Sequence, residues 1–210
     1  MYNAVNIHTG NQQMKVTKAQ AQANRAHVVE TASALFRERG YDGVGVADLM
    51  AAAGFTHGGF YKHFGSKAEL MAESAACGMA KTAALGEGLD AAEFVRLYLA
   101  REHRDGRAAG CTMAALGGDA VRQPEAVRAT FADGIENLLA LLGRADAASE
   151  AAEAGQARAR AINILAHAVG AIVMSRACPD DSALADEILA VCRQELLGSL
   201  GASAGAEPAG

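Results

Sequence analysis

The sequence predicts an all-α protein, and three observations support this fold class. Alanine, the strongest helix former, supplies 50 of the 210 residues, whereas there are three prolines and no tryptophan. Residues that favour strands are sparse. Apolar residues recur at spacings of three and four, the period of a helix with one buried face. With 51% hydrophobic and 20% charged residues, the composition argues against a sandwich, a barrel or a disordered chain.

The N-terminal elements follow from this periodicity and from the residues that end each helix. Residues 1–17 are polar, and we expect a flexible arm. A helix is predicted over 18–39, and Gly40 closes it as a left-handed cap. Its apolar face consists of Val28, Val29, Ala32, Leu35 and Phe36. A short helix over 46–53 follows, and Gly54 ends it.

A third helix is predicted over 56–64, separated from the second by a short turn of the helix-turn-helix kind. Thr56 is its expected side-chain N-cap, because a threonine hydroxyl can accept a hydrogen bond from the first helical turn. Phe60 and Phe64 are spaced i, i+4 and therefore share its inner face. Gly65 ends this helix.

A capping box and a series of longer helices complete the chain. Ser66 and Glu69 form an S-x-x-E box that opens a helix over 66–85. The remaining predicted helices, which bring the total to about nine, span 91–104, 109–121, 124–143, 157–177 and 181–198. Residues 144–156 are weakly patterned and form either a loop or a poorly anchored helical stretch. We expect the Gly/Ala/Ser-rich tail, 201–210, to be disordered.

The charge of the chain is unevenly distributed. The formal net charge is −5 and the pI is about 5.7, which excludes a globally basic nucleic-acid binder. Residues 1–70 nevertheless hold seven Lys and Arg against five Asp and Glu, whereas residues 71–210 hold twelve against nineteen. The N-terminal third is therefore locally basic, which suggests that it contacts an anion.

The cysteine pattern and the N-terminus indicate the compartment. The four cysteines form no C-x-x-C motif and no close cluster with histidine, so we expect a reducing cytoplasm and no metal or cofactor. They are Cys77, Cys111, Cys178 and Cys192. The first residues, Met1–Gln13, lack the features of a signal peptide, and no apolar run reaches 18 residues, so we expect no membrane partner. Met14 is a possible second translation start.

The most informative segment is the outer face of the third predicted helix, which carries Gly58 and Gly59. In an alanine-rich chain each of these glycines is unfavourable by about 1 kcal/mol relative to alanine. A helix without side chains can approach another surface closely, and the DNA major groove admits one helix. Lys62 points outward with Gly58, and Lys62 and His63 can reach base edges or phosphates. Tyr61 can donate a hydrogen bond to a phosphate oxygen.

The start of the next predicted helix offers a second anion contact, together with simpler alternatives. Free backbone N–H groups at Ser66 and the cation of Lys67 can bind a phosphate. Aromatic residues at helical spacing are usually core, and we assign the neighbouring phenylalanines to it. Tyr61 can also pack with only its hydroxyl in water, and Lys67 can be a solvated charge. Short helices joined by glycine also occur in bundles that never touch DNA.

A set of motifs over about 45 contiguous residues resembles the N-terminal domain of TetR-type (TetR/AcrR) transcriptional regulators. The motifs are Ala34-Leu35-Phe36, Gly40-Tyr41, Val46-Ala47-Asp48-Leu49, Ala53-Gly54-Phe55-Thr56, Phe60-Tyr61-Lys62-His63-Phe64 and Ser66-Lys67-Ala68-Glu69-Leu70. A later stretch resembles one subgroup of that family, through Tyr98-Leu99, His103-Arg104-Asp105, Gly110-Cys111 and Ala114-Ala115-Leu116. The chain departs from the family pattern at Gly45, where Thr or Ser usually caps the helix, and at Gly58-Gly59, where other side chains often appear.

The resemblance implies a homodimer with a helix-turn-helix DNA-binding domain at 18–65 and a larger helical effector-binding and dimerisation domain at 66–200. The first helix of the larger domain would be a connector. Two recognition helices would read a palindromic double-stranded DNA operator, and a small-molecule effector would release a repressor from it. The residues assigned to DNA are Lys18, Arg25, Gly45, Thr56, His57, Gly58, Gly59, Tyr61, Lys62, His63 and Lys67.

The effector half supplies two further sets of candidate residues. By resemblance, the apolar stripes of the last two helices form the dimer interface, with intrachain core as the alternative: Ile162, Leu165, Val169, Val173, Leu184, Ile188 and Val191. Candidate effector-pocket residues are Phe94, Tyr98, Cys111, Met113, Phe131, Leu138 and His167. His167 can instead be a core histidine. Cys111 is either a thiol that senses oxidants or electrophiles, as in some relatives, or a buried inert cysteine.

Two other classes of protein compete with a DNA-binding regulator, namely a small helical enzyme and a helical scaffold. The sequence contains no G-x-S-x-G, no H-E-x-x-H and no Gly-rich phosphate loop after a strand. His103 lies on a neighbouring predicted helix and can meet Cys111, but no residue evidently orients such a pair. We therefore expect no catalytic residues.

Overall fold

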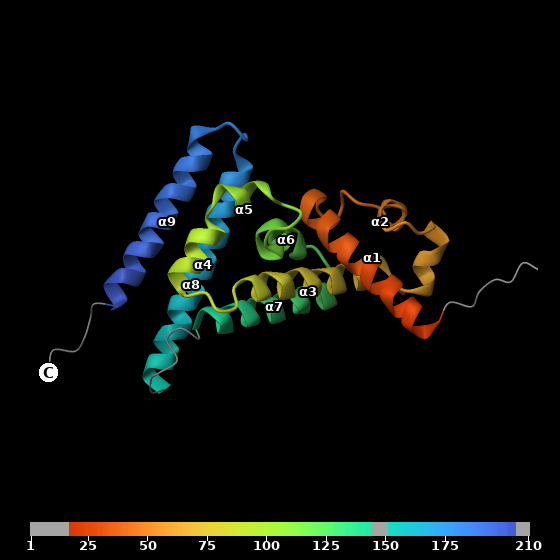
Figure 1. Cartoon of the computed structure of the whole chain (residues 1–210), viewed down its shortest axis with the longest axis horizontal. Helices are drawn as coiled ribbons and strands as arrows, with labels where there is room; N and C mark the ends of the chain where they lie inside the picture. Colours follow the sequence, from red (N-terminus) through yellow and green to blue (C-terminus); the bar gives the residue numbers. More distant parts are fainter. Residues whose placement is uncertain (1–16, 144–150, 205–210) are drawn as a thin grey trace, which may run out of the picture.

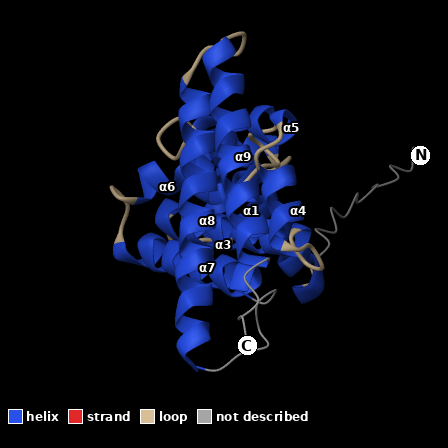
Figure 2. Cartoon of the chain, turned by 90° about the vertical axis from the view of Figure 1, so that its left-hand side faces the viewer, coloured by secondary structure: helices blue, strands red, loops and turns tan. Residues whose placement is uncertain are grey.

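Every regular element of this computed structural model within the described residues, 17–143 and 151–204, is a helix, as the sequence predicts (Figure 2). The predicted arm lies outside the described residues except for Thr17. The elements are α1 (Lys18–Arg39), α2 (Val46–Ala52), the 3₁₀ helix η1 (His57–Lys62), α3 (Lys67–Leu85), α4 (Ala91–Tyr98), α5 (Arg101–Asp105), α6 (Thr112–Ala120), α7 (Glu125–Gly143), α8 (Ala151–Ala177) and α9 (Ala183–Ala204).

The predicted helix over 91–104 was wrong, because the structure divides it into α4 and α5. Leu99 ends α4, and Ala100 is extended with a ψ of 152°. Both residues are good helix formers, so the break has a tertiary cause. The Tyr98 carbonyl at the end of α4 lies 2.6 Å from His103 Nδ1, and the side chain of Leu99 is fully buried.

Several predicted helix ends also differ in detail. Gly40 has the expected positive φ of 76°, but its ψ of 166° lies outside the left-handed helical region, so the predicted cap type was wrong. Thr56 makes no side-chain cap. Ser66 accepts from the Glu69 N–H as predicted, but the Glu69 carboxylate accepts from the N–H of Gly65, not that of Ser66. The predicted disordered tail was wrong for residues 201–204, which extend α9; the rest lies outside the described residues.

The N-terminal three helices, α1, α2 and η1, enclose an aromatic core. Phe36 of α1 packs edge-on against Tyr41 with ring centroids 5.0 Å apart, and Phe60 lies 5.5 Å from Phe64. All four rings are buried, together with Leu49 of α2. The prediction that Phe60 and Phe64 share the inner face is therefore confirmed, and the outer residues of η1 are held on a rigid base.

Helix α3 connects the N-terminal helices to the larger part of the molecule. It packs against α1 at one end and along α7, and α7 in turn packs on α8, which pairs with α9. Figure 1 shows the three N-terminal helices at one end of the molecule and α9 at the other, with α3 running between them. Close packing of α3 on α7 requires Gly134, where an added Cβ would lie 2.8 Å from Met79 Cγ.

Helix α8 contains a long apolar segment. Gly155–Ala177 has a mean hydropathy of 1.2 and is long enough to cross a membrane, although no span was expected from the sequence. The same helix packs on α7 and α9 and buries Ala168, Ala171 and Ile172 completely. This packing assigns the buried side of α8 to the helical core.

Candidate functional site

The outward face of η1 is presented by a tight corner between α2 and the 3₁₀ helix. Gly54 ends α2 with a φ of 78°, and the Phe55 N–H donates to the Met50 carbonyl at 2.8 Å. The chain then turns into η1, whose inner residue Phe60 is buried, whereas Tyr61 is 70% exposed. This is a helix-turn-helix corner with an open polar face.

The 3₁₀ geometry changes which side chains of η1 lie in line. In a 3₁₀ helix, residues three apart eclipse each other, so Gly58 aligns with Tyr61 and Gly59 with Lys62. The predicted alignment of Gly58 with Lys62, which assumed an α-helix, was therefore wrong. Gly58 and Lys62 are nevertheless both exposed. The centre of the His57 ring lies 6.4 Å from that of the Tyr61 ring.

No contact within the described chain accounts for Gly58. A Cβ built there would meet nothing within 4 Å, and at Gly59 the nearest atom, Met50 Cε, would lie at an ordinary 3.5 Å. Neither glycine has a positive φ. Since the fold itself does not require glycine, the open backbone is available for close approach by another molecule.

Three of the predicted DNA-contacting residues are already engaged within the chain. The Arg25 guanidinium pairs with Glu69 and Glu73, donates to the His63 carbonyl and lies 4.6 Å from the centre of the Phe64 ring. Lys67 Nζ donates to the Tyr41 carbonyl at 2.6 Å. The half-buried His63 ring packs between aromatic neighbours. Contact of the Arg25 and Lys67 side chains with DNA, which stays a prediction, would require them to leave these partners.

The other predicted contacts lie at exposed helix starts. Lys18 opens α1, which Thr17 caps by accepting from the Gln20 N–H at 3.1 Å. Gly45 precedes α2, and its N–H donates to Asp48 Oδ2 at 3.1 Å. Thr56 precedes η1 and is exposed.

An apolar pocket of about 280 Å³ lies in the larger part of the molecule. Residues at the end of α3, along α4 and in the loop before α6 line it: Thr82, Leu85, Gly86, Leu89, Phe94, Leu97, Tyr98, His103, Ala109, Gly110 and Cys111. Phe94, Tyr98 and Cys111 are therefore brought together as predicted candidates. Phe131 and Leu138 are buried in the core, Met113 lines a separate apolar groove, and His167 is half-buried elsewhere.

The residues that line this pocket include two with polar side-chain groups close together, Tyr98 and Cys111. The Tyr98 hydroxyl is buried and has no hydrogen-bond partner among the described residues. Burial, and then the nearby Cys111 thiol, raise the pKa of Tyr98 well above its ordinary value, so the phenol stays protonated. A protonated, unpartnered hydroxyl in an apolar pocket is a donor available to a ligand.

His103 is held in one neutral tautomer. Its Nδ1 lies 2.6 Å from the Tyr98 carbonyl, so this nitrogen carries the proton, and its Nε2 accepts from the Cys111 N–H at 3.0 Å. Burial lowers the pKa of the imidazole, and the charge of Arg176 lowers it further. The predicted meeting of His103 and Cys111 is confirmed, but both ring nitrogens are occupied by the backbone, which leaves no base for the thiol.

The stability of the protein should depend on pH through His103. Its folded pKa lies below its unfolded value, so the unfolded chain binds this proton first as the pH falls below about 6.5, and stability is lost there. We expect His103→Gln to reduce the loss of unfolding free energy between about pH 7 and pH 5.5, as measured by urea denaturation. The exposed His27→Gln is the control. Identical pH profiles for wild type and His103→Gln would contradict this assignment.

The predicted dimer residues form an exposed apolar surface on α8 and α9. Ile162 and Val173 are each 46% exposed, Leu184 53% and Val191 52%. Val169 and Ile188 are half-buried, whereas Leu165 belongs to the intrachain core. Large apolar side chains left exposed on two adjacent helices fit an interface with another molecule.

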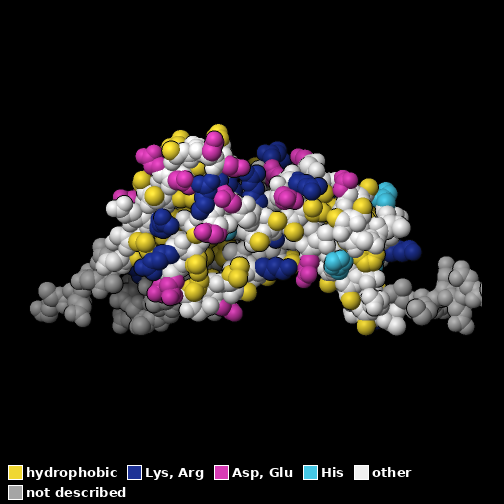
Figure 3. Space-filling view, turned by 45° about the horizontal axis from the view of Figure 1, so that its top comes forward, with side chains coloured by type: hydrophobic (Ala, Val, Ile, Leu, Met, Phe, Trp, Pro, Cys, Tyr) yellow, Lys and Arg dark blue, Asp and Glu magenta, His cyan; other side chains and the backbone are white. Residues whose placement is uncertain are grey.

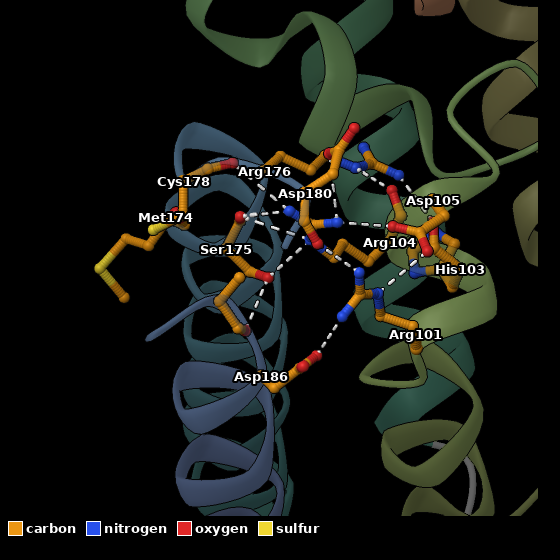
Figure 4. Close-up of polar contacts among 11 residues, drawn as sticks. Arg101, His103, Arg104, Asp105, Met174, Ser175, Arg176, Cys178, Asp180 and Asp186 are labelled. Carbon is orange, nitrogen blue, oxygen red and sulfur yellow. Dashed lines mark hydrogen bonds and ion pairs between the residues drawn. The ribbon is translucent and has the colours of Figure 1, made fainter. Parts of the chain in front are cut away.

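Sequence reasoning missed a network of arginines that joins α5 to α8 and α9 (Figure 4). Arg104 is 1% exposed and donates to Ser175 Oγ at 3.0 Å and to the Ser175 carbonyl. Arg176 donates to the carbonyls of His103 and Arg104, both at 2.8 Å. The sequence signal that could have indicated this network was Arg176, a charged residue near the otherwise apolar end of α8.

The fold of the N-terminal helices and the exposed face of η1 are those of a helix-turn-helix domain. Residues 28–73 match the sequence model described as bacterial regulatory proteins, tetR family. The N-terminal helices of the chain are therefore similar in sequence to the TetR family of regulators.

The curated relatives match over about a quarter of the chain or less. The chain is 44% identical to the HTH-type transcriptional regulator TtgR of Pseudomonas putida over 55 residues, 26% of each chain. It is 51% identical to the HTH-type transcriptional repressor DhaR of a Mycobacterium species over 43 residues, 20% of this chain and 22% of that one. The match thus spans about a quarter of the length of these relatives.

Solved structures share the fold over most of the chain. The reduced form of E. coli NemR has a TM-score of 0.65 at 19% identity, covering 84% of this chain and 96% of that one. AibR in complex with isovaleryl coenzyme A and operator DNA has a TM-score of 0.55 at 18% identity, covering 84% and 97%. The chain therefore shares its fold with these solved structures over most of its length, including the helices that follow α3.

Proposed function

We propose that this protein is a cytoplasmic transcriptional repressor that binds a palindromic DNA operator as a homodimer and is released by an effector. The observation that carries the proposal is the face of η1, where Tyr61 and Lys62 flank a helix backbone left open at Gly58. This face offers a cation, a phenol and close backbone approach to a groove. In a dimer, two such faces would read half-sites about 34–36 Å apart.

The exposed apolar surface of α8 and α9 is the proposed dimer interface. Ile162, Val173, Leu184 and Val191 would be buried by the same helices of a second copy. Pairing these two helices with their copies gives a four-helix bundle, an arrangement that buries an apolar face of each helix. The spacing of the two η1 faces would then depend on how the effector halves pack.

The apolar pocket between α3, α4 and the loop before α6 is the proposed effector site. Its walls suit a largely apolar ligand, and the free Tyr98 hydroxyl can donate to one polar group of that ligand. The Cys111 side chain also lines it, so a reactive effector would have a nucleophile within reach. AibR, which shares the fold, is found in complex with both isovaleryl coenzyme A and operator DNA, which supports separate sites for a small molecule and for DNA.

Lys62→Ala is expected to weaken binding to a duplex from the protein's own promoter region by about tenfold or more, because each dimer would lose two cationic contacts. Tyr61→Phe should weaken it by a smaller factor, since only a hydroxyl is lost. Fluorescence anisotropy at several salt concentrations measures both effects. The slope of affinity against salt should fall in Lys62→Ala and remain unchanged in Tyr61→Phe.

Lys81→Ala is the matched control, because Lys81 is an exposed lysine of α3 that lies 3.8 Å from Glu30 in an exposed ion pair. It should bind as wild type does, and a scrambled duplex should bind weakly to all variants. Wild-type affinity in both Lys62→Ala and Tyr61→Phe would refute the placement of the DNA face. No preference for the promoter duplex would refute the regulator itself.

A further inference from the structure

Three arginines converge on a second cleft, which lies between the N-terminal helices and the rest of the molecule. Its volume is about 270 Å³, and it is lined by α1, the loop between α5 and α6, α6 itself and the end of α8. Arg37, Arg107 and Arg176 all line it, and none of its lining residues belongs to the apolar pocket. Figure 3 shows Lys and Arg side chains, interspersed with Asp and Glu, over the middle of the molecule.

Arg37 reaches the cleft from α1 and is almost fully buried. Its Nε donates to the Ala108 carbonyl at 2.9 Å and its Nη1 to Ser33 Oγ at 2.6 Å. These partners are neutral, and no carboxylate pairs with it in the described part of the chain. Burial lowers the pKa of this guanidinium, which shows that its charge is poorly solvated.

Arg176 reaches the same cleft from α8. Its Nε and Nη2 donate to backbone carbonyls, whereas its Nη1 is buried and has no hydrogen-bond partner among the described residues. Burial lowers its pKa, and the charges of Arg107 and Arg104 lower it further. Arg107 itself is exposed in the loop before α6.

The carboxylates near this cleft do not neutralise it. Glu38, the one acidic residue on its lining, is half-exposed and lies 3.5 Å from Arg39. Asp105 and Asp180 pair with Arg104 instead. Buried charges in proteins are normally paired, because burial removes their hydration without replacing it. An anion in the cleft would relieve both the lost hydration and the mutual repulsion of the arginines.

We propose that this cleft binds a small oxyanion, a phosphate or carboxylate group, held by Arg176 and Arg107 beside Arg37. The planar guanidinium groups of the three arginines that line the cleft match the oxygens of such a group. Because Arg37 belongs to α1 and Arg176 to α8, the bound anion joins the DNA-binding helices to the effector half. The oxyanion is either a free molecule or an acidic side chain of a second copy.

The test is to titrate the DNA-free protein with inorganic phosphate at constant ionic strength and to measure binding by isothermal titration calorimetry. Wild type should bind phosphate saturably, and sulfate should compete. Arg107→Gln should raise the Kd at least about fivefold, since it removes one charged contact, and Arg176→Gln should raise it further. Arg96→Gln, which changes an exposed arginine of α4 outside the cleft, is the matched control and should leave the Kd unchanged.

Arg107→Gln keeps the test decisive even if Arg176→Gln folds poorly, because the exposed Arg107 side chain donates no hydrogen bond within the described residues. Absence of saturable phosphate binding to wild type, or equal Kd values for wild type and Arg107→Gln, would overturn the free-anion site. If phosphate has no effect and Arg107→Gln instead dissociates the dimer in sedimentation, the oxyanion is a carboxylate of the second copy.

Discussion

Replacing Arg104 by methionine is expected to lower the free energy of unfolding by about 2–4 kcal/mol, because buried acceptors would lose their donor. The guanidinium donates to the Ser175 side chain and carbonyl and to the Cys178 carbonyl, all on or next to the end of α8. Methionine fills much of the same volume but donates nothing. Urea denaturation followed by circular dichroism measures the effect.

Arg101→Met is the matched control, since it is the same substitution in the same short helix, α5. Arg101 also pairs with Asp105 and Asp186, but its side chain is 40% exposed. The ions of an exposed pair are rehydrated when the pair is lost, and the unfolding midpoint should change little. If Arg104→Met is no less stable than Arg101→Met, the buried network does not hold α5 to α8.

Gly78→Ala should destabilise the protein although alanine favours helices. A Cβ at Gly78 in α3 would approach Thr112 Oγ1, Arg37 Nη1 and Ser33 Oγ closer than 3.0 Å. Arg37 Nη1 donates to both hydroxyls, so these three groups have little room to move. We expect a net loss of about 1–3 kcal/mol in the free energy of unfolding, the usual range for overpacking. Chemical denaturation measures it.

Gly118→Ala, at another helical glycine, is expected to have the opposite effect on the free energy of unfolding. A Cβ there would meet nothing within 4 Å, so only helix propensity acts and stability should rise by at most about 1 kcal/mol. A Gly78→Ala protein as stable as Gly118→Ala would show that the Arg37 cluster yields without penalty. In that case α1 would not be rigidly joined to α6.

The N-terminal helices were predictable because their signals are local. The periodicity of Val28, Ala32 and Phe36 and the glycine at position 40 set α1, and both bounds agree with the prediction. The hydroxyl of Ser66 similarly begins α3. The exposed positions of Tyr61 and Lys62 were also predictable from spacing, since a residue opposite two buried phenylalanines is exposed in either helix type.

The effector pocket was only partly predictable, because its walls come from elements that are distant in sequence. Phe94 and Tyr98 lie on one apolar stripe, as do Phe131 and Leu138, and periodicity cannot say which stripe faces a cavity. Packing of α7 on α3 placed the second pair in the core. His103, by contrast, entered the pocket because the break after α4 turned it toward Cys111.

The sequence by itself determined the helical class, the helix-turn-helix corner and its exposed face, because propensity, periodicity and glycine punctuation act over a few residues. Only the tertiary structure decided the roles of the arginines. Arg104 meets Ser175 across 71 residues, and Arg37 meets Ala108 across the same separation. A charged side chain is stable in the interior only when polar groups from other elements surround it. The local sequence pattern does not indicate which polar groups will surround a given arginine.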